Sequence, residues 1–527
     1  MAPNAEKRRV GEAAGVVGFF TLLSRILGLV RDMVFARFFG DGMAADAFFV
    51  AFRIPNLLRR LFAEGSLTIA FIPVFTEYLT RKSRKDAFLL ARAVLTLLSA
   101  VLVGITVLGI LCSPWIVRIQ AYGWGGAGAK YELTVLLTRI MFPYILLVSI
   151  VALFMGILNA LRHFAAPAAA PILLNIGIIG ATLWLSPHFS EPVVGVAVGV
   201  LIGGVLQLAL QLPWILKKGV TLLPAWLPRH PAVRRIGLLM VPAVYGSAVY
   251  QLNQFIATLL ATFLPEGSVS WLYYADRIVE FPLGVFAIAI STAVLPSLSR
   301  HAAGGDREGF GDTLEYAIRL VFFISVPSMA GLIVLGRPII QVFFERGAFG
   351  PLSTDMTLTA LFFYSMGLWA FSANRVMVSA FYALQDTKTP VKTATAAMAA
   401  NFVFSLSLMG PLRHGGLALA LSLASTLQFF LLLYLLKRKT PFFGLGVILK
   451  SGVKSLAASV LMGGVVYYLS VAWRDLAPPE SLWDVALMLV VLVPVGALIY
   501  FSLAKLFRLR ELQTLKDILG PLLKRRP

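Results

Sequence analysis

Residues 87–112 read AFLLARAVLTLLSAVLVGITVLGILC, a run that holds one charged side chain, Arg92. An α-helix needs about 20 mostly apolar residues to cross the hydrocarbon core of a bilayer. The rest of the chain has the same character, since 59% of its 527 residues are hydrophobic and 13% are charged. A soluble domain carries roughly twice that charged share. The sequence therefore predicts an all-α polytopic membrane protein and argues against a water-soluble fold.

Apolar runs of this kind recur along the chain, separated by Gly, Pro or clusters of charge. They predict fourteen transmembrane helices, near residues 12–38, 46–80, 87–112, 131–158, 166–186, 193–216, 235–263, 270–299, 313–335, 356–384, 391–410, 416–436, 451–472 and 483–506.

Basic residues are distributed unevenly over the loops between these spans. We count 28 on the side of the N-terminus and 6 on the opposite side. Lys and Arg gather on the cytoplasmic side of membrane proteins, so we expect both termini in the cytoplasm. The net charge of +21 is then mainly a topology signal, with attraction to anionic lipids as a secondary effect. We expect no nucleic-acid partner.

Short motifs recur at offsets of 221 to 224 residues, which indicates an internal duplication. Pro114 corresponds to Pro338, for example, and residues 206–207 (LQ) correspond to residues 427–428 (LQ). Six helices lie in each repeat, so both halves enter the membrane from the same face and the repeat is parallel. Transporters built this way place their site between the halves.

The repeat predicts three regions. Residues 1–218 form an N-lobe of six helices, residues 219–440 form a C-lobe of six, and residues 441–527 add two helices and a basic cytoplasmic tail. We expect the two lobes to surround a central cavity.

Nine arginines fall inside the predicted spans, away from the membrane ends: Arg25, Arg31, Arg37, Arg53, Arg59, Arg60, Arg139, Arg277 and Arg375. An ionised residue at membrane depth costs a few kcal/mol unless it faces a wet cavity or a partner. A guanidinium also offers a planar fork that binds phosphate or carboxylate with two hydrogen bonds. Three others, Arg92, Arg319 and Lys454, lie near cytoplasmic ends, where a long side chain can reach the headgroups.

Five acidic residues accompany these arginines: Asp32, Asp46, Glu64, Asp276 and Glu280. The set keeps a cationic surplus of about +4, which suits an anionic substrate. Arg53, Arg60 and Glu64 share one face of their helix, and Asp276, Arg277 and Glu280 share a face of another. The alternative is that these groups only pair with one another across helices to fix packing. The sequence holds one cysteine, Cys112, and five scattered histidines, so we expect neither a metal site nor a cofactor.

Four stretches resemble the MurJ (MviN) family of lipid II flippases: residues 24–32 (SRILGLVRD), 46–65 (DAFFVAFRIPNLLRRLFAEG), 273–282 (YYADRIVEFP) and 385–390 (QDTKTP). The resemblance spans essentially the whole chain. It implies the fold of the multidrug/oligosaccharidyl-lipid/polysaccharide exporter superfamily, and transport of lipid II from the cytoplasmic to the periplasmic leaflet of the inner membrane for peptidoglycan synthesis. Lipid II is an undecaprenyl-pyrophosphate-linked disaccharide-pentapeptide, whose headgroup is anionic.

The resemblance also implies roles for residues of this chain. Substrate-binding residues would be Arg25, Arg31, Arg59 and Arg277, and cavity or gating residues would be Asp46, Arg53, Arg60, Glu64, Asp276 and Glu280. The two C-terminal helices would hold the polyprenyl tail. Some members of the family are thought to bind sodium, but helix 235–263 has Asn253 and Gln254 without a nearby Asp, so sodium or membrane-potential coupling is left open.

Three other functions explain the internal arginines less well than lipid II transport does. A drug or cation antiporter of the same superfamily would favour carboxylates and aromatics over nine arginines. A non-transporting scaffold of the cell-wall machinery would leave the internal arginines unexplained, although other cell-wall synthesis proteins are plausible partners. An enzyme is disfavoured because the longest outer loops, 113–130 and 336–355, offer little acid or base chemistry. We therefore expect no catalytic residues.

Overall fold

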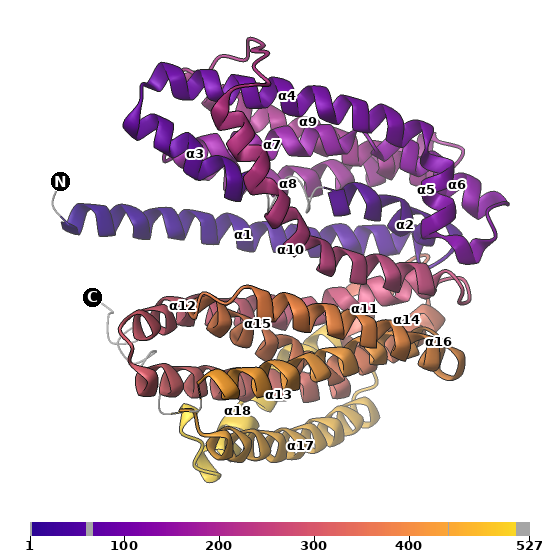
Figure 1. Ribbon diagram of the computed structural model, residues 1–527. Helices are drawn as coiled ribbons and strands as arrows, with labels where there is room; N and C mark the ends of the chain where they lie inside the picture. The colour runs from indigo at the N-terminus through magenta and orange to yellow at the C-terminus, as the bar shows by residue number, and fades with distance from the viewer. Residues whose placement is uncertain (1–2, 59–66, 441, 513–527) are drawn as a thin grey trace. The chain divides into compact units, whose positions relative to one another are not determined.

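The computed structural model describes residues 3–58, 67–440 and 442–512, and these residues form helices and loops without any β-strand (Figure 1). Nine helical segments within them are long and apolar enough to cross a membrane, and a tenth arises if the bent pair α14 (Pro351–Met366) and α15 (Leu368–Ala383) counts as one span. The prediction of an all-α polytopic membrane protein is confirmed. The number of fourteen spans stays a prediction.

The chain divides into two compact units, Met1–Ser270 and Trp271–Pro527, and each is described by itself. The predicted lobes, 1–218 and 219–440, stay a prediction, because a repeat is defined by corresponding sequence and a compact unit by contacts.

The described residues of unit one form ten α-helices and the start of an eleventh. They are α1 (Pro3–Phe39), α2 (Met43–Leu58), α3 (Thr68–Arg81), α4 (Arg84–Leu111), α5 (Ser113–Gln120), α6 (Ala129–Met141), α7 (Tyr144–Ala160), α8 (Ala165–Gly180), α9 (Pro192–Lys217), α10 (Pro231–Ala261) and the first residues of α11 (Ser268–Pro282). The main core of the unit is apolar and lies among α3, α4, α7, α9 and α10, where side chains such as Phe71, Phe75 and Leu153 are fully buried.

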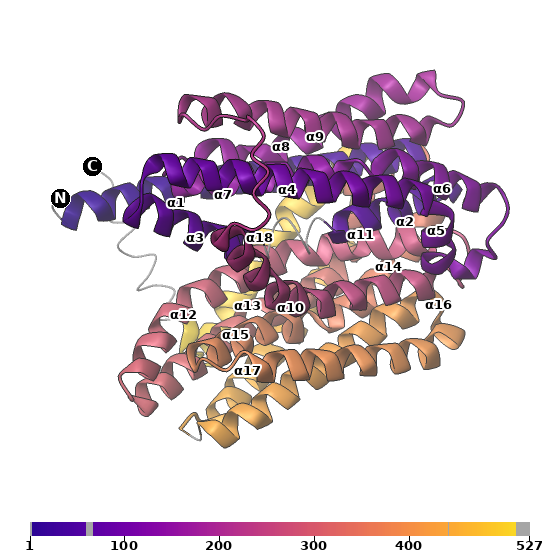
Figure 2. The same cartoon turned by 45° about the horizontal axis from the view of Figure 1, so that its top comes forward.

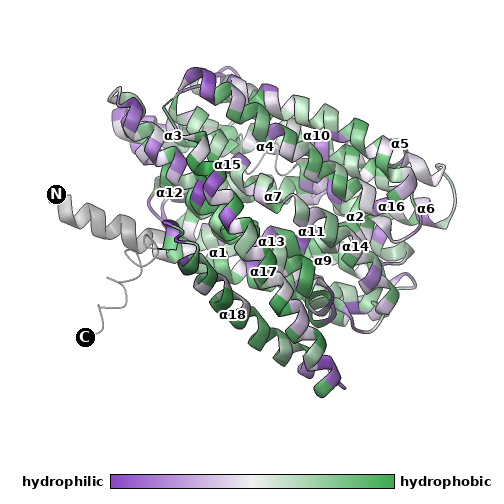
Figure 3. Cartoon of the chain, turned by 90° about the horizontal axis from the view of Figure 1, so that it is seen from below, coloured by the Kyte–Doolittle hydropathy of each residue, from purple (hydrophilic) through white to green (hydrophobic). Residues whose placement is uncertain are grey.

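Unit two continues α11 through a π-helical turn, Leu283–Ala287, into α12 (Ile288–Ala303). It then forms α13 (Arg307–Phe344), α14 (Pro351–Met366), α15 (Leu368–Ala383), α16 (Lys388–Lys439), α17 (Leu445–Leu476) and α18 (Leu482–Leu506). Of its two cores, one packs α13 against α15 and α16, and the other packs α13 against α17 and α18. Figure 3 shows α18 as mostly hydrophobic along its length.

Local sequence explains where several helices begin and break. Ser83 and Asp86 form a capping box at the start of α4, which satisfies backbone N–H groups that a helix end leaves free. Predicted span 131–158 is broken before Tyr144 by Pro143, and span 356–384 bends at Gly367. Predicted spans 391–410 and 416–436 both lie in α16, which consists of two helices joined across a kink at Arg413, whose φ is 50°.

Glycines bring α8 and α9 into close contact, and the two helices lie side by side in Figures 1 and 2. A Cβ added at Gly177 would lie 2.7 Å from the Cα of Gly203, and one added at Gly199 would lie 2.5 Å from the Cβ of Ala181. Small residues at such a seam let helix backbones approach and pack without lipid between them.

We expect Gly203→Val to destabilise the protein by about 1–3 kcal/mol, because the added side chain would overlap Leu174 on α8. Thermal unfolding in detergent would show a lower Tm than the wild type. Gly104→Val is the matched control, because a Cβ at Gly104 meets nothing within 4 Å. Equal Tm values for the two variants would show that the α8–α9 seam is not tightly packed.

Candidate functional site

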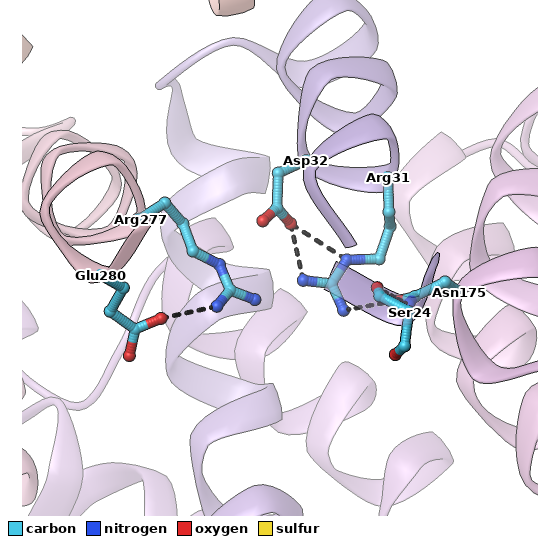
Figure 4. A network of polar contacts seen from close by, with 6 residues as sticks. All are labelled: Ser24, Arg31, Asp32, Asn175, Arg277 and Glu280. Atoms are coloured by element: carbon cyan, nitrogen blue, oxygen red, sulfur yellow. Dashed lines mark hydrogen bonds and ion pairs between the residues drawn. The ribbon is translucent and has the colours of Figure 1, made fainter. Parts of the chain in front are cut away.

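Arg31 on α1 is held by two neighbours inside unit one (Figure 4). Its Nε and Nη2 atoms donate to Oδ1 of Asp32 at 3.0 and 2.7 Å, and its Nη1 donates to Oδ1 of Asn175 on α8 at 3.3 Å. Asn175 in turn donates to the backbone oxygen of Ser24 at 3.1 Å. The side chains of Arg31 and Asp32 are 12% and 4% exposed. The pair is therefore a buried, oriented ion pair, and its guanidinium plane is fixed by a second helix.

Arg277 on α11 in unit two is paired within its own helix. Its Nη1 donates to Oε2 of Glu280 at 2.9 Å, and its guanidinium lies 5.5 Å from the ring centre of Tyr273 (Figure 4). The side chains of Arg277 and Glu280 are 34% and 39% exposed, so this pair is more accessible than the pair on α1. Asp276 is half-buried beside Arg277 on the same helix.

Arg25 and Arg53 are the other arginines with a predicted substrate-binding or gating role that the structure describes. Arg25 is exposed on α1 and makes no hydrogen bond or ion pair with the described part of the chain. Arg53 on α2 is half-buried, and its Nη1 donates to Oε1 of Gln254 on α10 at 3.1 Å. Arg59, Arg60 and Glu64 lie outside the described residues.

Asp46, near the start of α2, is 1% exposed and gathers four donors. Lys130 at the start of α6 donates to its Oδ2 at 2.7 Å, as does the backbone N–H of Gly267 at 2.9 Å. The backbone N–H and the hydroxyl of Ser270 donate to Oδ1 at 3.0 and 2.7 Å. Asp46 thus fixes α2, α6 and the residues with which unit one ends.

Two arginines of the predicted site form ion pairs with carboxylates close to them in sequence. Arg31 pairs with Asp32, the residue next in sequence, and Arg277 pairs with Glu280, three positions on. Their charges are compensated locally, as is usual for ionised groups in an apolar setting. Asp32 and Glu280 are already among the five acidic residues of the predicted set, so these two pairs leave its surplus of about +4 unchanged.

One polar cluster of unit two is absent from the sequence-based site. Arg319 on α13 is 8% exposed. Its Nε donates to Oε1 of Glu511 at 2.5 Å, and its Nη1 donates to Oε1 of Glu315 at 3.0 Å. Ser451 on α17 also donates to Glu511, at 2.9 Å. The expectation that Arg319 extends to the headgroups is wrong, because Glu511, assigned to the cytoplasmic tail, folds back and neutralises it.

Asp386 organises the loop between α15 and α16, within the motif QDTKTP. It accepts hydrogen bonds from the N–H of Lys388 at 3.1 Å, from the N–H of Thr389 at 3.0 Å and from the Lys439 ammonium. Partial burial acts to raise its pKa, but the hydrogen bonds from Lys439 and Thr389 outweigh burial and hold the pKa of Asp386 well below its usual range.

A pKa that is lower in the folded state than in the unfolded state adds stability above the unfolded value of about 4 and loses it as the pH falls. We therefore expect the wild type to lose Tm between pH 5 and pH 3 faster than Asp386→Asn, which cannot titrate there. Asp312→Asn, at an exposed position on α13, is the control and should behave as the wild type. The same pH dependence in all three proteins would contradict the role of Asp386.

The fold and these buried ionised groups define a polytopic helical membrane protein that keeps charged side chains within apolar helices, as transporters do. A family model described as "Lipid II flippase MurJ" matches residues 35–487. The chain belongs to this family. The family and its assignment to transporters rather than enzymes, both predicted from sequence, are confirmed, as is a multi-pass protein of the inner membrane.

Named relatives and solved structures agree. The chain is 40% identical to the "Probable lipid II flippase MurJ" of Vibrio cholerae serotype O1, over 97% of this chain and 98% of the relative. It is 36% identical to the "Lipid II flippase MurJ" of Burkholderia cenocepacia, over 92% of this chain and 95% of the relative. A structure titled "Lipid II flippase MurJ, inward closed conformation" aligns with a TM-score of 0.77 at 28% identity, over 93% and 98%. An inward-facing multidrug transporter of the MATE family aligns with a TM-score of 0.68 at 15% identity, over 81% and 98%, which shows the fold alone.

Proposed function

We propose that this protein moves lipid II from the cytoplasmic to the periplasmic leaflet by alternating access, for cell-wall synthesis. The observation that carries the proposal is the oriented guanidinium of Arg31 within an apolar helix, in a chain that belongs to the lipid II flippase family. Lipid II carries a pyrophosphate, which a guanidinium fork binds with two parallel hydrogen bonds.

Arg25, Arg31, Arg59 and Arg277 bind the pyrophosphate in this proposal. Arg25 is exposed and has no partner within the described residues, so it meets the phosphate first. Arg31 and Arg277 exchange a carboxylate partner for a phosphate oxygen. This exchange releases Asp32 or Glu280, and substrate binding thereby changes the electrostatic state of helices α1 and α11.

Asp46 and Glu280 act as gating residues, together with Arg53, Arg60, Glu64 and Asp276. Asp46 supports this role by holding Gly267 and Ser270, the last residues before the second compact unit begins. If the hydrogen bonds from Gly267 and Ser270 to Asp46 changed, the change would be transmitted to the second unit through the backbone that follows Ser270.

The proposed topology has fourteen spans and two parallel six-helix lobes around a central cavity, with both termini cytoplasmic. Ten spans follow from the helices that are long and apolar enough to cross a membrane, if the bent pair α14 and α15 counts as one. The break of α16 at Arg413 supports two spans in place of one. In the proposal α1, α10 and the pair α2 and α3 supply the remaining three. Helices α17 and α18 form the groove for the polyprenyl tail. Their exposed apolar side chains, among them Val453, Val460 and Val490, favour contact with lipid.

The energy source of transport is a separate part of the proposal. Groups of three or more His, Cys, Asp or Glu side chains that could hold a metal ion do not occur among the described residues. The cationic set of helices would respond to the membrane potential, since one charge moved across 100 mV is worth about 2.3 kcal/mol. We propose potential coupling, with sodium as the alternative, and membrane lipids and other cell-wall synthesis proteins as partners.

The proposal is tested by leaflet-resolved movement of lipid II in vesicles that contain only this protein. We expect lipid II to reach the opposite leaflet faster than in empty vesicles, and an imposed potential to change the rate. Absence of movement with and without a potential or an ion gradient would favour the scaffold function instead.

A further inference from the structure

A cavity of about 350 Å³ lies in unit two where α13 ends and where the loop between α17 and α18 begins. This volume is within the range of small-molecule sites. Its lining combines opposite chemistries. Two guanidinium groups, Arg337 and Arg474, and the carboxylate of Glu480 provide charge, while Pro338, Val485 and Met488 provide an apolar wall.

The two arginines keep donors available. Arg474 donates from Nε to the backbone oxygen of Ser470 at 3.1 Å and from Nη2 to the hydroxyl of Ser470 at 3.3 Å. Both contacts lie within its own helix, and no described carboxylate pairs with it. Arg337 pairs with Asp355 through Nη1, which leaves Nε and Nη2. A guanidinium has five N–H donors, so each arginine can still bind an oxyanion.

The negative group of the cavity is also available. Glu480 is exposed, and its carboxylate accepts no hydrogen bond from the described residues. Asp484, in the first turn of α18, is by contrast occupied in the capping box with Ser481, where it accepts from Ser481 and from the N–H of Glu480. The cavity therefore presents to a ligand the guanidinium of Arg474, the guanidinium of Arg337 beside its partner Asp355, and the carboxylate of Glu480. This arrangement fits a zwitterion better than a simple anion.

Two large exposed side chains close in sequence to lining residues favour a lipid over a soluble ligand. Trp483 at the start of α18 is 84% exposed, and Leu476 at the end of α17 is 86% exposed. Tryptophan is enriched at the level of lipid headgroups, where its amphipathic ring is stable. Inorganic phosphate has no apolar surface to bury against the wall beside the charged groups. The glycerol and first acyl carbons of a lipid do have such surface, so the apolar wall favours a lipid.

We propose that this cavity binds the headgroup of a zwitterionic phospholipid with a primary ammonium, such as a phosphoethanolamine lipid. The phosphate accepts hydrogen bonds from Arg474 and Arg337, and the ammonium donates to Glu480. By the topology proposed above the lipid belongs to the outer leaflet. The site itself depends on neither that topology nor transport of lipid II.

Native mass spectrometry of the detergent-purified full chain tests this site, with ethanolamine, choline and glycerol phospholipids of identical acyl chains as probes. We expect wild type to retain the ethanolamine lipid about tenfold more strongly than the choline lipid, because a quaternary ammonium cannot donate a hydrogen bond to Glu480. Glu480→Gln should remove this discrimination. Arg474→Ala should weaken retention of all three lipids by about tenfold, since each contacts it through phosphate.

Controls at the opposite end of unit two are Arg300→Ala and Glu308→Gln, both at exposed positions. They should retain the lipids as the wild type does. Arg474→Ala removes contacts only with its own helix turn, and an unchanged Tm would verify that it folds. Equal retention of lipids by Arg474→Ala, Glu480→Gln and the controls would overturn the proposal. Displacement of the lipid by soluble phosphoethanolamine at the same concentration would overturn the assignment to a lipid.

Discussion

Arg31→Ala is expected to abolish rescue of a bacterial strain depleted of its own lipid II flippase. The substitution removes the fork proposed to bind pyrophosphate, and it leaves Asp32, 4% exposed, as a buried carboxylate without its guanidinium. Removing one partner of a buried ion pair costs about 3–5 kcal/mol. Growth and accumulation of lipid II in the depleted strain are the measurements.

Arg31→Lys separates folding from transport in this experiment. Lysine keeps the positive charge beside Asp32 but lacks the planar fork, so we expect a folded protein with strongly reduced rescue. Arg37→Ala is the matched control, because Arg37 is exposed on the same helix, and it should rescue growth as the wild type does. Full rescue by Arg31→Ala would show that Arg31 serves neither substrate binding nor packing.

Asp46→Ala is expected to have the second large effect. The variant would leave four donors without an acceptor, including the ammonium of Lys130, whose side chain is 17% exposed. We expect the free energy of unfolding to fall by about 3–5 kcal/mol and transport to be lost. Thermal unfolding in detergent and rescue of the depleted strain measure the two effects.

Asp46→Asn tests whether charge or shape matters at this position. Asparagine has one carbonyl oxygen to accept from Ser270 or Gly267, but it has no charge to pair with Lys130. We expect an intermediate Tm and impaired rescue. Glu132→Gln is the control, because Glu132 is exposed and lies on α6 shortly after Lys130. If both Asp46 variants matched the wild type in Tm and in rescue, the gating proposal would fail.

Much of the fold was predictable because membrane helices are set by local composition. The length of an apolar run predicts where a transmembrane helix begins and ends. Helices α9 and α18, for example, begin and end within one residue of predicted spans 193–216 and 483–506. Interruptions were harder to predict. Pro143 divides one predicted span into α6 and α7, which the apolar pattern alone does not show. The kink of α16 at Arg413, by contrast, falls between predicted spans 391–410 and 416–436, next to Gly410, Pro411 and Gly415.

The candidate site was predictable only in part. The residue types and the shared helix face of Arg277 and Glu280 follow from sequence, because positions three apart lie together on a helix. Partners from distant segments do not. Asn175 lies 144 residues from Arg31, and Glu511 lies 192 residues from Arg319. Such contacts depend on how helices pack, which apolar periodicity alone does not specify.

Binding of lipid II to the purified protein tests most directly whether these arginines recognise phosphate. The comparison is with an analogue of lipid II in which an uncharged linker replaces the pyrophosphate. We expect the wild type to prefer lipid II by at least about tenfold, as loss of charge-assisted hydrogen bonds implies, and Arg25→Ala, Arg31→Lys and Arg277→Ala each to reduce that preference, whereas Arg37→Ala leaves it intact. Equal affinity of the wild type for both ligands, or an unchanged preference in all three variants, would contradict a phosphate-binding role for the internal arginines.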